Sequence, residues 1–430
     1  MLYYARGSKT DNITPDEVRA ILKEVFDKMG PKNRVVALPP DFTRFNSYAG
    51  PITEMVYDYF QDKLTDVMPA LGTHTPMTEE QIKTMFGHTP REIFRVHDWR
   101  NDVVTVGEVP VEYVEKVSEG KLHYTWPAQV NKMLLEKDID LILSIGQVVP
   151  HEVIGMANYT KNIFVGVGGN LGINRSHFIG AVYGMERLMG RAKSPVRDVM
   201  EYARQHFIKD LPIVYIQTVL AKNYETGKME LKGIFIGDDF ECFQKAADLS
   251  LETNFIMVEK PIKKCIVYLD PEEFKSTWLG NKAVYRTRMA LADDGDLIIL
   301  APALREFGED SAIDKLIRKY GYKGTPKILK DTDENADLQE NLGASAHLIH
   351  GSSEGRFRIT YCPGPAMSRE EIEGVGFIYG DLNEMLAKYP IDKMKDGWNT
   401  LPSGEEVYYI SNPALGLWAH PDRFKDYQIL

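Results

Sequence analysis

The sequence has 430 residues, of which 43% are hydrophobic and 26% charged, an ordinary balance for a folded protein of two domains. Its formal net charge of −11 at pH 7 argues against nucleic acid as a partner, because such partners attract basic surfaces. No apolar stretch approaches the roughly 18 residues that a membrane helix needs, and the N-terminus lacks the apolar core of a secretory signal. We therefore expect a cytoplasmic protein that binds neither nucleic acid nor a membrane.

Short β-branched segments alternate with longer amphipathic segments along the chain. This pattern predicts an α/β fold in which parallel or mixed sheets are flanked by helices. The first helix is expected over residues 14–29, because Pro15 suits its first turn and Gly30 follows its end. A later helix is expected over residues 239–254. Strands are expected at residues 34–40, 67–73, 139–146 and 296–302.

Polar side chains directly follow three of the expected strands. Asp41 and Arg44 come after the first strand, His74 after the second and His151 after the third. Ligands of open α/β sheets bind outside the carboxyl ends of the strands, where side chains and helix N-termini converge. The sequence therefore predicts that these four residues share one site.

The segment at residues 150–177 reads PHEVIGMANYTKNIFVGVGGNLGINRSH and holds His151, Lys161 and His177. Imidazoles bind metals or move protons, and a sheltered lysine amine can form covalent bonds. The apolar, glycine-rich stretch after Lys161 indicates that this lysine lines a pocket instead of the surface. The backbone N–H groups of Gly166, Gly168 and Gly169 could approach a phosphate there. The same glycine pattern also suits an ordinary tight turn.

Four segments in order resemble the nickel-dependent lactate racemase family, whose members interconvert the two configurations of 2-hydroxy acids. They are PPDFTR at residues 39–44, GTHTPMT at 72–78, the segment at 150–177 and WLGNK at 278–282. The family cofactor is a nickel pincer nucleotide, nickel pyridinium-3,5-bisthiocarboxylic acid mononucleotide, which takes part in reversible hydride transfer. The resemblance thus implies an isomerase, a racemase or epimerase that inverts C2 of a 2-hydroxy acid.

The resemblance also implies which residues hold the cofactor. Lys161 matches the lysine that is joined to the nucleotide through a thioamide, and His177 matches the single histidine ligand of nickel. Asp41 matches a neighbour in the DxTR motif of the cofactor pocket. Cofactor-synthesis enzymes would then be partners during maturation.

The remaining motif residues match groups that act on the substrate. His74 and His151 match the paired acid/base histidines, one for each configuration of the substrate. Arg44 and Lys282 match residues that bind the substrate carboxylate, and Trp278 matches an aromatic wall beside it. The expected small-molecule partner is a 2-hydroxy acid.

Two departures from the family pattern bear on specificity. Many relatives carry a glycine pair shortly before the lysine, whereas this chain has Asn158, Tyr159 and Thr160, so this wall of the pocket must differ. Lactate-active relatives place a polar residue where Leu279 stands here. This leaves open a substrate other than lactate, such as a sugar acid.

The spacing of motifs loosens after Asp238, which predicts a domain boundary near Val258. Residues 1–258 are expected to form an N-terminal cofactor-binding and catalytic α/β domain. Residues 259–404 are expected to form a C-terminal α/β domain that closes over the substrate, with the active site in the cleft between them. The final segment, 405–430, is expected to pack back on the first domain.

Two alternative functions remain open from the residues alone. A mononuclear zinc hydrolase would use His74, His151 and His177 as metal ligands, but it leaves Lys161 without a role. A non-catalytic protein that binds a nucleotide cofactor would keep Lys161 but give the paired histidines no task.

Overall fold

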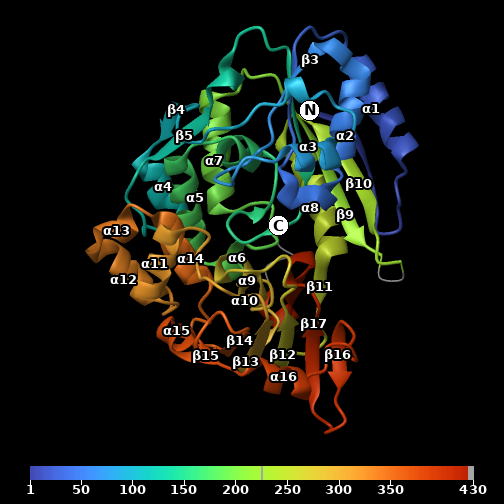
Figure 1. Ribbon diagram of the computed structural model, residues 1–430. Coiled ribbons are helices and arrows are strands. Elements are labelled where there is room, and N and C mark those ends of the chain that lie inside the picture. Colours follow the sequence, from blue (N-terminus) through green and yellow to red (C-terminus); the bar gives the residue numbers. More distant parts are fainter. Residues whose placement is uncertain (224–225, 425–430) are drawn as a thin grey trace. The chain divides into compact units, whose positions relative to one another are not determined.

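The computed structural model describes residues 1–223 and 226–424, which form two compact units (Figure 1). The first unit contains residues 1–179 and 188–254, and the second contains residues 180–187 and the chain from residue 255 onward. The boundary between Asn254 and Phe255 lies close to the one expected near Val258. The short segment 180–187 is assigned to the second unit although the chain on both sides of it belongs to the first, which motif spacing did not indicate.

The core of the first unit is a six-stranded mixed sheet. Its order is β1 (Leu2–Gly7), β10 (Met229–Gly237), β9 (Ile213–Lys222), β6 (Leu141–Gln147), β2 (Val35–Leu38) and β3 (Leu64–Val67). β9, β6, β2 and β3 run parallel to one another, whereas β10 runs antiparallel to both of its neighbours, β9 and β1. All four residues of β2 are buried, as expected for a central strand that is covered on both faces.

The predicted first helix is confirmed as α1 (Pro15–Met29). Thr14 and Glu17 form a reciprocal capping box at its start, and Gly30 follows its end with a φ of 73° that favours glycine. The face that carries Val18 and Leu22 is buried in the core. Further helices of this unit are α2 (Ala49–Phe60), α3 (Glu79–Phe86), α4 (Val111–Val117), α7 (Pro195–Phe207) and α8 (Phe240–Asn254).

The strand expected at residues 67–73 lies earlier in the chain and overlaps that range only at Val67. The regular strand is β3, which finishes at Val67, and the chain then continues beside β2 through bonds from Met68 N to Ala37 O and from Ala70 N to Pro39 O. Proline lacks the N–H that a regular ladder needs, so Pro69 ends the strand. The sequence pattern missed the true strand because polar Asp66 interrupts its apolar run. In the structure Arg34 and Arg95 form ion pairs with the buried Asp66 carboxylate.

Two small antiparallel pairs and several short helical turns complete the first unit. β4 (Val103–Val109) pairs with β5 (Trp126–Asn131), and β7 (Pro150–His151) pairs with β8 (Gly155–Met156). A π-helical segment, Asn162–Gly166, precedes α5 (Asn170–Tyr183). The end of α5 and most of α6 (Met185–Leu188) lie in the segment 180–187 of the second unit.

The second unit is also α/β. Its sheet has the order β15 (Ile378–Tyr379), β14 (Arg358–Pro363), β13 (Leu291–Ala301), β12 (Ile262–Tyr268), β17 (Glu406–Ile410) and β16 (Gly397–Thr400), and only β16 runs antiparallel to its neighbour in the described residues. Its helices are α9 (Thr277–Gly280), α10 (Lys282–Tyr285), α11 (Ser311–Tyr320), α12 (Thr325–Glu334), α13 (Ala336–Gln339), α14 (Leu342–His350), α15 (Arg369–Gly374) and α16 (Leu382–Lys388).

The described part of the segment 405–430 differs from the expectation that it packs on the first domain. β17 pairs with β12, and β18 (Leu417–Ala419) pairs with β11 (Phe255–Met257), so both strands belong to the second unit. Backbone pairing places β17 and β18 in the second unit. The composition of this segment, rich in proline and aromatic residues, did not indicate that pairing. Among the described helices, none combines the length and the apolar character that crossing a bilayer requires.

Candidate functional site

Three neighbouring parallel strands of the first unit end at the same edge of its sheet. β2 leads to Asp41 and Arg44, and β6 leads to His151 in the short strand β7. β3 leads, through the extended residues after Val67, to His74 just ahead of α3. The sheet thus brings these side chains to one edge, as the sequence predicted.

Asp41 and His74 form a hydrogen-bonded pair. Asp41 Oδ2 lies 2.7 Å from His74 Nδ1, and the Thr43 hydroxyl donates to the other carboxylate oxygen. Burial alone would raise the pKa of Asp41, but these hydrogen bonds and the charges of His74 and Arg44 lower it below its ordinary value. Because the carboxylate accepts from Nδ1–H, the other ring nitrogen of His74 keeps its lone pair and can accept a proton.

His151 has the opposite arrangement of ring protons. Its Nδ1 accepts a hydrogen bond of 3.1 Å from the backbone N–H of Val153, so Nε2 carries the proton in the neutral ring. Burial lowers the pKa of His151 well below 6.5, with the nearby cations Lys161 and Arg44 acting in the same direction. His151 is therefore neutral at pH 7 and offers an N–H donor, whereas His74 offers an acceptor.

Lys161 immediately precedes the π-helical segment, a feature frequent at functional sites. Burial lowers the pKa of its amine to about 8, helped by Arg44 and Arg197 and opposed by Glu152. The next residue, Asn162, donates from Nδ2 to Leu38 O and to Ser144 Oγ, both at 2.9 Å. A lysine with this pKa has an appreciable neutral, nucleophilic fraction near neutral pH.

His177 lies on α5 and is held by its own helix. Its Nδ1 donates to the Ile173 carbonyl oxygen at 2.7 Å, which leaves the lone pair on Nε2. Burial lowers the pKa of His177 to about 4, so the ring is neutral at physiological pH. A neutral imidazole whose other nitrogen is already bonded is the form that binds a metal ion.

The charges of these groups act on one another, which places them in one neighbourhood of the first unit. Lys161 and Arg44 lower the pKa of His151, Lys161 also lowers the pKa of His177, and Asp41 raises the pKa of Lys161. Together with the hydrogen bond between His74 and Asp41, these effects link six of the predicted site residues: Asp41, Arg44, His74, His151, Lys161 and His177.

The predicted substrate contacts Trp278 and Lys282 lie on short helices of the second unit. The Trp278 ring stacks on His347 with centroids 4.3 Å apart, and Lys282 Nζ lies 5.5 Å from the centroid of the Phe274 ring. Their roles toward a substrate stay predictions.

The three glycines expected to approach a phosphate have a packing reason in the structure. A Cβ at Gly166 would lie 2.8 Å from the Ala70 side chain, and one at Gly168 only 1.9 Å from the Phe164 carbonyl oxygen. At Gly169 it would lie 2.5 Å from the side chain of Gln129. Close approach of protein atoms therefore suffices to explain these glycines, and their contact with a phosphate stays a prediction.

Two buried residues that sequence reasoning missed support this neighbourhood. His97 bonds through Nε2 to the Gly168 carbonyl oxygen and through Nδ1 to Asn131, which fixes the glycine-rich stretch. Arg197 on α7 is fully buried and donates to the loop before Lys161. The local sequence around His97 and Arg197 does not indicate a supporting role, because the hydrogen-bond partners of both residues lie far away in the sequence.

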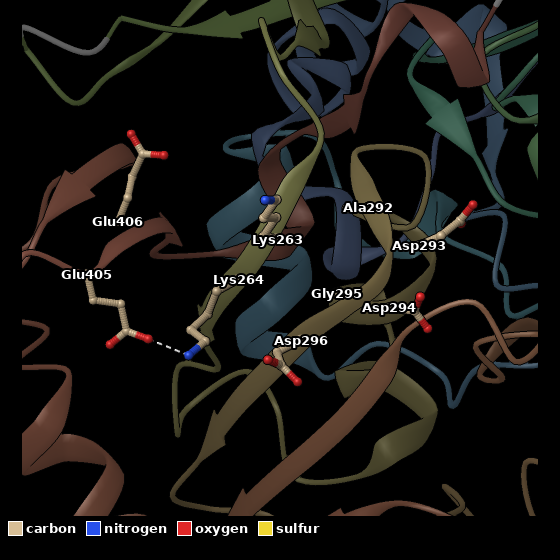
Figure 2. Close-up of a pocket in the computed structure, with 9 residues that line it drawn as sticks. All are labelled: Lys263, Lys264, Ala292, Asp293, Asp294, Gly295, Asp296, Glu405 and Glu406. Carbon is tan, nitrogen blue, oxygen red and sulfur yellow. Dashed lines mark hydrogen bonds and ion pairs between the residues drawn. The ribbon is translucent and has the colours of Figure 1, made fainter.

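A shallow surface cavity of about 430 Å³ lies elsewhere, in the second unit. Figure 2 shows Lys264 directed at Glu405 on its wall, with Asp293, Asp294 and Asp296 around it. None of the predicted site residues lines it.

Within residues 1–223 and 226–424, no three His, Cys, Asp or Glu side chains gather closely enough to hold a metal ion. The described part of the chain thus offers no three-histidine zinc site of the kind that the hydrolase hypothesis requires. A single histidine ligand beside a covalently held group is a different arrangement, which this finding does not address.

Comparison with known proteins confirms the resemblance inferred from the motifs. Residues 18–187 match the family model of the lactate racemase N-terminal domain. The fold is similar to that of a structural-genomics protein from Thermotoga maritima, with a TM-score of 0.81 and 21% identity over 96% of this chain and 100% of that chain. It is also similar to the lactate racemase apoprotein from Thermoanaerobacterium thermosaccharolyticum, with a TM-score of 0.72 and 16% identity over 95% of this chain and 93% of that chain. No curated protein matches the sequence.

Proposed function

We propose that this chain, which carries a lactate racemase N-terminal domain at residues 18–187, is a racemase or epimerase that inverts C2 of a 2-hydroxy acid with a nickel pincer nucleotide as its cofactor. The observation that carries the proposal is the pair His74 and His151, whose hydrogen bonds leave one ring as a proton acceptor and the other as a donor. Inversion needs one such histidine for each configuration of the substrate, because the C2 hydroxyl points in a different direction in each of the two configurations.

The residues of the first unit suit this cofactor. The Lys161 amine has a pKa lowered to about 8, which suits covalent attachment, and His177 keeps a lone pair on Nε2, which suits nickel. When bound, the nucleotide would supply a reversible acceptor for the hydride of C2. Phosphate contacts from Gly166, Gly168 and Gly169 belong to the proposal only as predictions.

The chain's own groups would handle the substrate and its protons. The exposed guanidinium of Arg44 can bind the carboxylate by charge-assisted hydrogen bonds, and we expect Lys282 to contribute a second cation. His74 Nε2 can take the hydroxyl proton, and the imidazolium so formed can return it, while the neutral His151 Nε2–H can donate a hydrogen bond to the substrate oxygen. Asp41 holds His74 in the required tautomer. We further expect Trp278 to form a wall beside the substrate.

The direct test is a screen of 2-hydroxy acids and sugar acids with cofactor-loaded protein, followed by chiral analysis of each product. Conversion of one configuration into a mixture of both supports the proposal. A covalent adduct without turnover of any such acid would instead favour a non-catalytic nucleotide-binding protein. Co-expression with cofactor-synthesis enzymes is part of the design, since we propose that they act on this chain in the cytoplasm.

We expect His177→Ala to lower the nickel content of the loaded protein far more than His74→Ala or His151→Ala. The reason is that His177 keeps a neutral Nε2 lone pair, whereas the other two rings are oriented for proton transfer. Metal analysis of the three purified variants, each checked for an unchanged melting temperature, measures this. Equal loss of metal from all three would contradict the assignment, and zinc in place of nickel would revive the hydrolase hypothesis.

Asp41→Asn should lower the rate of interconversion by about 10²–10⁴-fold without loss of the covalent adduct. An amide can place its own N–H against Nδ1 and so favour the wrong tautomer of His74. Thr43→Val is the matched control, because it removes the hydrogen bond to the other carboxylate oxygen but leaves Asp41 able to accept from His74. Turnover by Asp41→Asn equal to that of the control variant would show that the carboxylate does not position the histidine.

A further inference from the structure

The loop before Lys161 has an unusual backbone. Asn158 and Tyr159 have φ values of 68° and 57°, so two successive residues with side chains occupy the left-handed region that glycine adopts most easily. Asparagine visits this region more readily than most residues but tyrosine does not, so contacts must hold Tyr159 in this conformation.

Arg197 supplies most of those contacts. Its guanidinium donates to Met156 O at 2.8 Å, to Asn158 O at 3.1 Å and to Thr160 Oγ1 at 2.7 Å. The side chain is 0% exposed and lies over the Phe243 ring, 4.3 Å from its centroid. A planar fork of donors can reach three acceptors on one loop, which a lysine ammonium on a flexible stem cannot do as well.

Other contacts hold both Arg197 and the loop that it binds. Ser194 Oγ accepts from Arg197 N at the start of α7 and donates to Ile154 O, so helix and loop are joined there too. The Tyr159 ring stacks on Phe243, with centroids 5.1 Å apart and planes 15° apart. The Asn158 amide donates to Gly146 O at the end of β6, at 2.8 Å.

We propose that Arg197 is a positioning residue for Lys161, acting through its three hydrogen bonds to the loop at residues 156–160. We call this arrangement the Arg197 clamp. Lys161 then lies between two anchors, because Asn162 on its other side is bonded to β2 and β6. The inference that this lysine carries a cofactor rests on the proposed function, whereas the clamp itself does not.

The environment of Lys161 gives the clamp a measurable signature. The charged and titratable groups coupled to it are Asp41, Arg44, Glu152, Arg197, His151 and His177. Burial is the largest cause of its lowered pKa, so a loop that relaxes toward water should let the pKa rise. A rise of one unit from about 8 would lower the neutral fraction at pH 8 about fivefold.

The test uses the full chain without cofactor. Acetic anhydride labelling of Lys161 is followed by peptide mapping across pH 6–10, and hydrogen exchange is measured for residues 156–160 and for β9. In Arg197→Lys we expect the labelling midpoint to move upward, labelling at pH 8 to fall about fivefold, and exchange to quicken in the loop but not in β9. Arg204→Lys is the matched control, since Arg204 lies on the same helix and pairs with Glu201.

Thr160→Val keeps the shape of the side chain but removes one acceptor of Arg197, so it serves if Arg197→Lys does not fold. We expect a smaller shift in the same direction. An unchanged midpoint and unchanged loop exchange in a folded clamp variant would overturn the clamp. If the clamp variants behave like the wild type but the loaded wild type carries an adduct on Lys161, the clamp is wrong and the proposed function stands. If the labelling midpoint shifts but no adduct forms on Lys161, the proposed function is wrong and the clamp stands.

Discussion

Replacing Lys161 with alanine should abolish the covalent adduct and all interconversion, the largest single loss that we expect from this chain. The amine has a pKa of about 8, so about half of it is neutral at pH 8, whereas an ordinary lysine of pKa near 10.5 is almost wholly charged there. Attachment should therefore become faster as pH rises toward 8 and level off above it. Intact-protein mass after co-expression with the cofactor-synthesis enzymes measures the adduct.

Lys161→Arg separates charge from nucleophilicity, because it keeps a cation but cannot be deprotonated at these pH values. We expect it to lack the adduct as well. Lys137→Ala, at an exposed position, is the control for removal of a lysine. An adduct mass that persists in Lys161→Ala would show that another residue carries the cofactor.

The second large effect concerns His74 and His151, each of which we expect to serve one configuration. Replacing either with asparagine should slow complete interconversion by about 10²–10⁴-fold while adduct and nickel remain. With substrate labelled by deuterium at C2, each variant should still exchange label with one enantiomer in single-turnover experiments. The two variants should differ in which enantiomer that is.

The buried position of His151 adds a pH dependence to this prediction. Its pKa lies well below 6.5, so the ring stays neutral below the pH at which an ordinary histidine becomes charged. The half-reaction that uses neutral His151 as an N–H donor should therefore keep its rate as pH falls through 6.5, where an ordinary histidine would become protonated. Near-wild-type interconversion by both single variants would show that these histidines are structural.

The sequence predicted the site better than the strand boundaries around it. Asp41, His74 and His151 could be placed because each follows a strand of one parallel sheet, and such ends converge whatever the length of the strand. The strand before His74 was placed too late in the chain, because buried Asp66 interrupts its apolar run and Pro69 ends its ladder. Compensation of a buried charge by Arg34 and Arg95 depends on tertiary contacts, which periodicity does not record.

Arg197 shows what sequence reasoning could not reach. It stands at an i, i+4, i+7 spacing with Glu201 and Arg204 on α7, a charge pattern typical of a solvated helix face. The structure buries it instead, and its two terminal guanidinium nitrogens donate to a loop some forty residues earlier in the chain.

The assignment of residues 180–187 to the second unit limits how this protein can be divided into fragments. Glu186 in that segment accepts hydrogen bonds of 3.1 Å from both Arg288 and Arg356 of the second unit. A fragment that starts at residue 255 lacks this carboxylate and leaves the buried guanidinium of Arg288 without its anionic partner, which is strongly destabilising. A gene cut at residue 255 would therefore yield a damaged second half, and any fragment meant to represent the second unit must carry residues 180–187 with it.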